Sequence, residues 1–181
     1  MVIVLIGGWF LLPDGYESVI AIFAPHFGNY VRPTAVMVNL ILVNPMSNFT
    51  MVAVWAGAGF VGGIMAGTKK GAFVVGLVTW LSSIGLLILC IYLVFQGALT
   101  LGSFVIPPGS SIVDILSIPL IQGLISDMVP MISGIFSGGG GLDMNVLLAL
   151  ATPLIIWFLT PAIIVIVAAI VGAVIRPKED F

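Results

Sequence analysis

The residue types that could do chemistry are few in this chain and widely spaced. There is one histidine, His26, and one cysteine, Cys90, among 181 residues that include seven acidic and five basic side chains. A metal site needs several converging ligands, and Asp14, Glu17 and His26 form the one candidate group, so an interfacial histidine explains His26 better. Cys90 lies inside an apolar run without an intrachain partner, which indicates buried packing.

The hydroxyl groups in the apolar stretches lack an activating partner. Thr79, Ser82 and Ser83 have no histidine or aspartate beside them, and hydroxyls in membrane helices usually bond back to their own helix. An intramembrane enzyme or ion pump needs ionisable groups at depth. No phosphate loop, haem-ligand histidine pair or thiol pair is present. The sequence therefore predicts no catalytic residue, no metal site and no cofactor.

The elements that hold these residues are dominated by long stretches without charge. Residues 71–113, 144–175 and 33–68 contain no charged side chain, and only 7% of the chain is charged, against about 25% in a soluble domain. A membrane helix needs about 20 apolar residues. With a mean hydropathy of +1.32, the chain is predicted to be an integral membrane protein.

The fold expected is all-α, a polytopic membrane helix bundle forming one domain over residues 1–181. We expect about four membrane helices, at residues 1–12 (too short to cross alone unless it continues beyond Pro13), 46–67, 71–96 and 146–175. The outer connections, 13–45 and 97–145, mix apolar and polar residues and are broken by prolines. This pattern is typical of interfacial or re-entrant helices.

The basic residues predict an orientation. Lys69 and Lys70 lie between the second and third spans, and Arg176 and Lys178 follow the fourth. The positive-inside rule places all four on the cytoplasmic side of a multi-pass protein in the cell membrane, with both termini cytoplasmic. No basic tract exists, so nucleic acid is not an expected partner.

A weak internal repeat is visible. Pro13-x-Gly15 precedes an apolar stretch that reaches Pro25, and Pro107-x-Gly109 precedes one that reaches Pro119. Parallel repeats of this kind occur in transporters, whereas proline and glycine also punctuate ordinary loops. Both interpretations stay open.

Glycines recur on one face of the second span. Gly59, Gly63 and Gly67 are spaced four residues apart, which lets another backbone approach closely. The segment 58–67, followed by two lysines and another apolar helix, resembles glycine-rich hairpins of many small prokaryotic membrane proteins. We expect this helix-packing interface to contact the third span within the chain, with contact between chains as the alternative.

Two asparagine motifs precede that span. Asn44-Pro45-Met46 is similar to the Asn-Pro helix caps of water channels, but it occurs in a single copy and is interpreted as a turn. Asn48-Phe49-Thr50 matches the glycosylation acceptor pattern close to the membrane, and we expect it to be unmodified.

The last span contains Thr152-Pro153 and Thr160-Pro161. Proline in a membrane helix frees carbonyl groups that neighbours must satisfy, so Pro153 and Pro161 are predicted helix kinks, either static or acting as hinges.

From these features we expect the protein to act by packing its helices against other membrane proteins. We expect a non-catalytic membrane subunit that packs, within the lipid bilayer, against other membrane protein subunits or itself, as an accessory or scaffold subunit of a larger complex. The alternative is a small channel or carrier for an uncharged solute, since a pathway without charge disfavours ions.

Overall fold

The computed structural model of the 181-residue chain describes residues 1–44, 48–98, 116–129, 133 and 144–177. The described elements are, in chain order, α1 Val2–Phe10, α2 Asp14–Phe27, α3 Val31–Ile41, α4 Phe49–Ala66, α5 Lys69–Ala98, α7 Pro119–Gly123, the π-helical turn η1 Leu124–Met128 and α9 Met144–Ile175. The expected all-α fold is confirmed.

Three of the helices are long and apolar enough to cross a membrane: Phe49–Ala66, Lys69–Gly97 and Ala151–Ile175. The expected spans at residues 46–67, 71–96 and 146–175 therefore correspond to α4, α5 and α9. A fourth crossing is reached only if α1 and α2 count as one span, and these two helices meet at an angle of 91°. Together they make a multi-pass membrane protein with three to four apolar helices able to span.

The first span is the one that the sequence described least well. α1 has 9 residues, about 14 Å of helix, which is less than half of a hydrocarbon core. The chain does continue as helix beyond Pro13, but Pro13 precedes α2 in an extended conformation, with φ −60° and ψ 144°. Because proline favours this geometry before a helix and not inside one, α2 starts afresh in a new direction.

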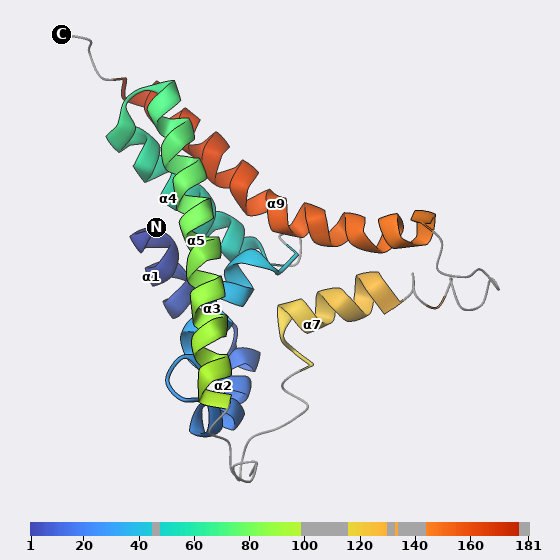
Figure 1. The fold of residues 1–181 in the computed structure, drawn as a ribbon. Coiled ribbons are helices and arrows are strands. Elements are labelled where there is room, and N and C mark those ends of the chain that lie inside the picture. The colour runs from blue at the N-terminus through green and yellow to red at the C-terminus, as the bar shows by residue number, and fades with distance from the viewer. Residues whose placement is uncertain (45–47, 99–115, 130–132, 134–143, 178–181) are drawn as a thin grey trace.

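The bundle has two parts arranged along α5 (Figure 1). α4 and the C-terminal part of α9 pack beside the first half of α5, whereas α1, α2 and α3 lie beside its second half. The main core joins these parts and includes the buried side chains Val4, Met37, Leu40, Trp55, Leu87 and Val165. α5 is the common wall of both parts.

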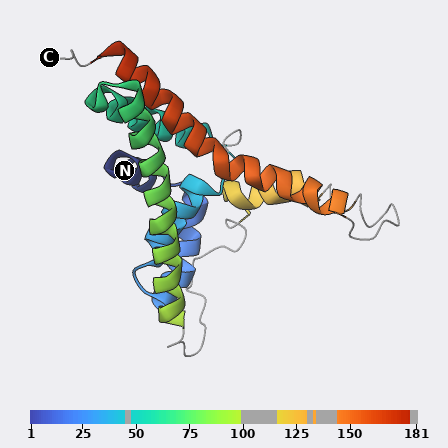
Figure 2. The same cartoon turned by 45° about the horizontal axis from the view of Figure 1, so that its top comes forward.

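The N-terminal part of α9 leaves this bundle. It runs outward with α7 and η1 beside it, as both ribbon views show (Figures 1 and 2). Leu120 and Leu124 face Leu154 and Trp157 across a recess of about 570 Å³. The molecule is therefore open, with an arm formed by α9, α7 and η1.

The helices of the outer connections are short. α2 and α3 lie in the connection 13–45, and α7 and η1 lie in 97–145. The Pro13 end of the possible repeat starts α2, whereas residues 107–109 lie outside the described residues. Pro25 lies inside α2 and Pro119 begins α7, so these two prolines occupy different positions in their helices.

Candidate functional site

Gly59 and Gly63 of α4 lie directly against the backbone of another helix. A Cβ atom added to Gly63 would overlap the carbonyl oxygen of Ala169, and one added to Gly59 would overlap the carbonyl oxygen of Val165. Both acceptors belong to α9. From the other side, a Cβ on Gly172 would overlap the carbonyl oxygen of Phe60. The two backbones approach closely here because α4 carries no side chain at these positions and the side chains of α9 are small.

The helix expected to pack on this face was the third span, and the structure corrects that partner to α9. α5 approaches α4 at Gly62, where a Cβ would come within 2.8 Å of Val75 Cγ1. The hairpin connection between α4 and α5 is short, but neighbours in sequence need not make the tightest contact. Small residues on α9 (Ala169, Gly172 and Ala173) allow the closer approach.

Gly67 has a role different from the one expected. It is the residue that ends α4, in the left-handed conformation with φ 67°, and its N–H bonds to Gly63 O. This conformation is unfavourable for residues with a Cβ. Gly67 is therefore needed for the turn to α5, whereas the backbone contacts with α9 are found at Gly59 and Gly63.

The prolines of α9 lie inside a continuous helix, Met144–Ile175. The Thr160 hydroxyl donates to Ile156 O at 2.6 Å, and the Thr152 hydroxyl donates to Leu148 O at 2.6 Å. A proline has no N–H for the carbonyl four residues before it. Each threonine hydroxyl bonds to the carbonyl one residue before that free carbonyl, and hydroxyl bonds of this kind bend helices. α9 changes direction along its length (Figure 1), and the assignment of the kinks to Pro153 and Pro161 stays a prediction.

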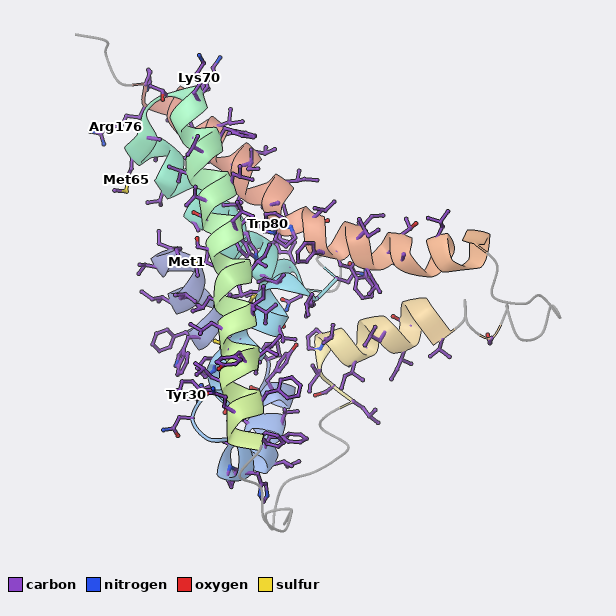
Figure 3. The ribbon with its side chains drawn as sticks, in the orientation of Figure 1. Met1, Tyr30, Met65, Lys70, Trp80 and Arg176 are labelled. Atoms are coloured by element: carbon purple, nitrogen blue, oxygen red, sulfur yellow. The ribbon has the colours of Figure 1, made fainter. Side chains whose placement is uncertain are left out.

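The basic residues meet at one end of the bundle. Lys70 and Arg176 lie close to the same end in Figure 3, where α4, α5 and the C-terminus of α9 meet. Met1, expected on that side, lies about midway along α5, where its Sδ is 3.2 Å from the Ser83 hydroxyl oxygen. Lys178 lies outside the described residues.

A polar cluster is buried where α3 meets the start of α4. The Asn48 amide donates to Asn39 Oδ1 at 3.2 Å, and Asn48 Oδ1 accepts from the Met51 N–H at 3.3 Å as the cap of α4. The Trp55 indole donates to Leu40 O at 2.9 Å. Asn48 is 8% exposed, so the motif 48–50 does not present a free acceptor for a glycan.

A charged cluster ties together the three short helices. Arg32 of α3 bonds to Glu17 of α2 at 2.9 Å and lies 4.9 Å from the ring centroid of Trp9 of α1. Glu17 is thus engaged by Arg32. No group of three or more His, Cys, Asp or Glu that could hold a metal ion occurs in the part of the chain that the structure describes.

The hydroxyls and the cysteine of α5 are packed into the bundle or bonded to their own helix. Ser82 donates to Val78 O, and Ser83 donates to Thr79 O at 2.9 Å. Cys90 is buried and free. None of these groups is placed beside an ionisable partner by the interactions found among the described residues, so they hold positions within the bundle.

The sequence did not identify a pocket at the far end of α5. Tyr16, Phe23, Phe27 and other residues of α2, α3 and α5 surround a cavity of about 240 Å³. A more polar recess of about 500 Å³, lined by Asn29, Tyr30 and Gln96, adjoins it at Phe27. No motif in the sequence includes Tyr16, because its surroundings depend on how α2 packs against α3 and α5.

Comparison with known proteins adds no relative: no family model, no curated protein and no solved structure matches this chain.

Proposed function

We propose that this chain is a non-catalytic membrane subunit that acts by helix packing within a larger membrane complex. The observation that carries the proposal is the arm. A helix as long and apolar as α9 leaves its own bundle, and among the described elements α7 and η1 alone lie beside it there (Figures 1 and 2).

The arm exposes large apolar side chains. Leu148, Leu154, Ile155, Ile156 and Leu159 are between 41% and 57% exposed. Lipid can cover such side chains, and so can a helix of another subunit that packs along the arm; we assign this exposed surface to such a helix.

Small residues on outward faces support a second contact. A Cβ on Gly57 of α4 or on Gly85 of α5 would meet nothing within 4 Å, so none of the described residues packs against these two glycines. Ser82 is exposed one turn before Gly85. Membrane helices associate through small residues of this kind, which makes the Gly85 face of α5 a surface for another subunit or a second copy.

The chemistry of the spans favours contact over catalysis. Beyond Lys70, the described residues of α5 and α9 contain no ionisable side chain apart from Cys90 and Tyr92, and proton relays and ion pathways need such groups at depth. The common position of Lys70 and Arg176 favours a cytoplasmic location for that end, with the C-terminus on the same side of the cell membrane.

The test is extraction of the chain from its native membrane in mild detergent, followed by native mass spectrometry of whatever co-purifies. We expect partner subunits in fixed stoichiometry. A stable, lone monomer would contradict the proposal. A homogeneous homo-oligomer with nothing attached would favour a channel or carrier for an uncharged solute, to be tested by solute flux in proteoliposomes.

A pair of variants locates the contact. Gly85→Leu places a large side chain on the open face of α5 and is expected to release the partner while the chain stays folded. The matched control is Phe73→Leu, on the same helix near the lysines, where a 47% exposed side chain is exchanged for another apolar one. Partner loss in both variants, or in neither, would exclude the Gly85 face as the contact.

A further inference from the structure

Three exposed basic side chains gather at one end of the bundle. Lys69 and Lys70 begin α5, and Arg176 follows the last residue of α9. Figure 3 shows Lys70 and Arg176 near the end where α4, α5 and α9 meet. We call these three residues the basic end.

The packing of α5 on α9 brings two of these cations to the same level of the bundle. Ala72 of α5 and Ala173 of α9 are buried in the same small cluster. Lys69 lies three residues before Ala72, and Arg176 lies three residues after Ala173, so each cation is about one turn beyond this contact on the same face of its helix. Because the two helices run in opposite directions (Figure 1), Lys69 and Arg176 extend the contact on the same side.

The helices around the basic end supply no acidic partner. The described helices α4, α5 and α9 contain no aspartate or glutamate, and the one ion pair found among the described residues joins Arg32 to Glu17 in the other part of the bundle. The start of α5 adds the partial positive charge of a helix N-terminus, which is unfavourable for lysines placed there. An anion bound at this end would relieve that repulsion.

The residues that follow Arg176 do not cancel the charge. Lys178, Glu179 and Asp180 lie outside the described residues, and adding them to the basic end gives four basic and two acidic side chains. Positive charge therefore remains in excess.

An apolar surface continues from the lysines into the membrane. Val74 and Val78 follow Lys70 at intervals of four residues on one face of α5, and each is 55% exposed. From Lys70 to Val78 this stripe is about 12 Å long. Phe73, four residues beyond Lys69, is exposed as well. A ligand that fits both surfaces has an anionic head and an apolar chain, whereas a soluble anion would contact the basic end alone.

We infer that the basic end binds the phosphate of an anionic membrane lipid, whose acyl chain lies along Val74 and Val78. Basic residues next to a membrane helix attract anionic head groups, and each one close to the surface strengthens binding about fivefold. A zwitterionic lipid with the same acyl chains makes the same apolar contact without the net charge. The inference does not depend on the partner subunit proposed above, whose contact lies further along α5 at Gly85.

The experiment compares the binding of two lipids to the full chain in detergent by native mass spectrometry. Phosphatidylglycerol is anionic and phosphatidylcholine is zwitterionic, and the two are supplied with identical acyl chains at equal concentration. The chain should prefer phosphatidylglycerol. Lys70→Gln should lower this preference about fivefold, and the triple variant with Lys69→Gln, Lys70→Gln and Arg176→Gln should remove it.

Two controls complete the test. Arg32→Gln removes the one basic residue of the sequence outside residues 69–70 and 176–178 and should leave the preference unchanged. Glycerophosphoglycerol, the anionic head group without acyl chains, should not displace phosphatidylglycerol at equal concentration. If it does, the basic end is a site for a soluble anion and the lipid is excluded. Equal binding of the two lipids by the original chain would overturn the inference, as would a preference that the triple variant keeps or that Arg32→Gln also loses.

Discussion

Replacing Gly63 by alanine tests the packing of α4 on α9 with the smallest possible change. The added methyl group would overlap the carbonyl oxygen of Ala169, which is backbone and cannot rotate away. Relief therefore requires the two helices to separate. Overpacking of this kind costs about 1–3 kcal/mol, and occasionally more.

Gly57→Ala is the matched control on the same helix. A Cβ there meets nothing within 4 Å, so the change removes only the flexibility of glycine in a helix, a gain of about 0.5–1 kcal/mol. Gly63→Ala carries the same gain, so the two variants should differ in the free energy of unfolding by the overpacking cost alone, about 1–3 kcal/mol. On the scale of about 2–4 °C per kcal/mol for chains of this length, their Tm values should differ by roughly 2–12 °C.

Gly62→Ala provides an intermediate case. The atom in its way is the Val75 Cγ1 at 2.8 Å, the end of a side chain that can shift. Its Tm should lie between those of Gly57→Ala and Gly63→Ala. The order of the three variants follows from what stands opposite each glycine, and hydrophobicity plays no part in it.

The single cysteine supplies the assay. Cys90 is buried and free, so a thiol-reactive fluorescent dye reports opening of the bundle during heating, and circular dichroism checks that helix content is unchanged beforehand. Equal Tm values for Gly63→Ala and Gly57→Ala would refute the backbone contact. A destabilised Gly57→Ala would instead show that this glycine is covered.

Three further predictions follow from the polar contacts and the bend. Asn48→Ala removes the cap of α4 and the donor to Asn39 Oδ1, and should lower the free energy of unfolding by about 1–3 kcal/mol in the same melting assay; an unchanged Tm would contradict the buried pair. Arg32→Ala breaks an ion pair with Glu17 in which both side chains are more than a third exposed. The free energy of unfolding should therefore fall by less than about 1 kcal/mol, and a larger fall would contradict the exposed position of this pair. Pro161→Ala restores an N–H to α9 and should lengthen the distance between spin labels near its two ends, measured by pulsed electron resonance; an unchanged distance would place the bend elsewhere.

The sequence determined that this chain is helical and lies in a membrane. Residues 71–113 and 144–175 carry no charge, and no arrangement in water buries that much apolar surface in 181 residues. Both ends of the spans predicted at 71–96 and 146–175 lie within two residues of the ends of α5 and α9. At one end of each helix, Lys69, Lys70 and Arg176 mark the point at which the chain leaves the apolar phase.

The tertiary structure decided which surfaces meet. The spacing of Gly59 and Gly63 indicates a face open to close approach, but α9 and not α5 lies against it, since pairing depends on the small residues that α9 presents more than 100 positions later. In the same way Gly67 continues the four-residue spacing yet serves the turn, because its conformation has φ 67°. Periodicity shows which residues share a face, and it says nothing of what packs there.

The cavity that α2, α3 and α5 form beside Tyr16 could not be predicted from the sequence for a related reason. It depends on the 91° change of direction between α1 and α2, which brings Tyr16 against Ala35 of α3 and Ile118. Local propensity favours a break at Pro13, but the angle after the break is set by the packing of α2 on α3 and α5. Long-range packing, which no local pattern encodes, is what buries the Tyr16 hydroxyl.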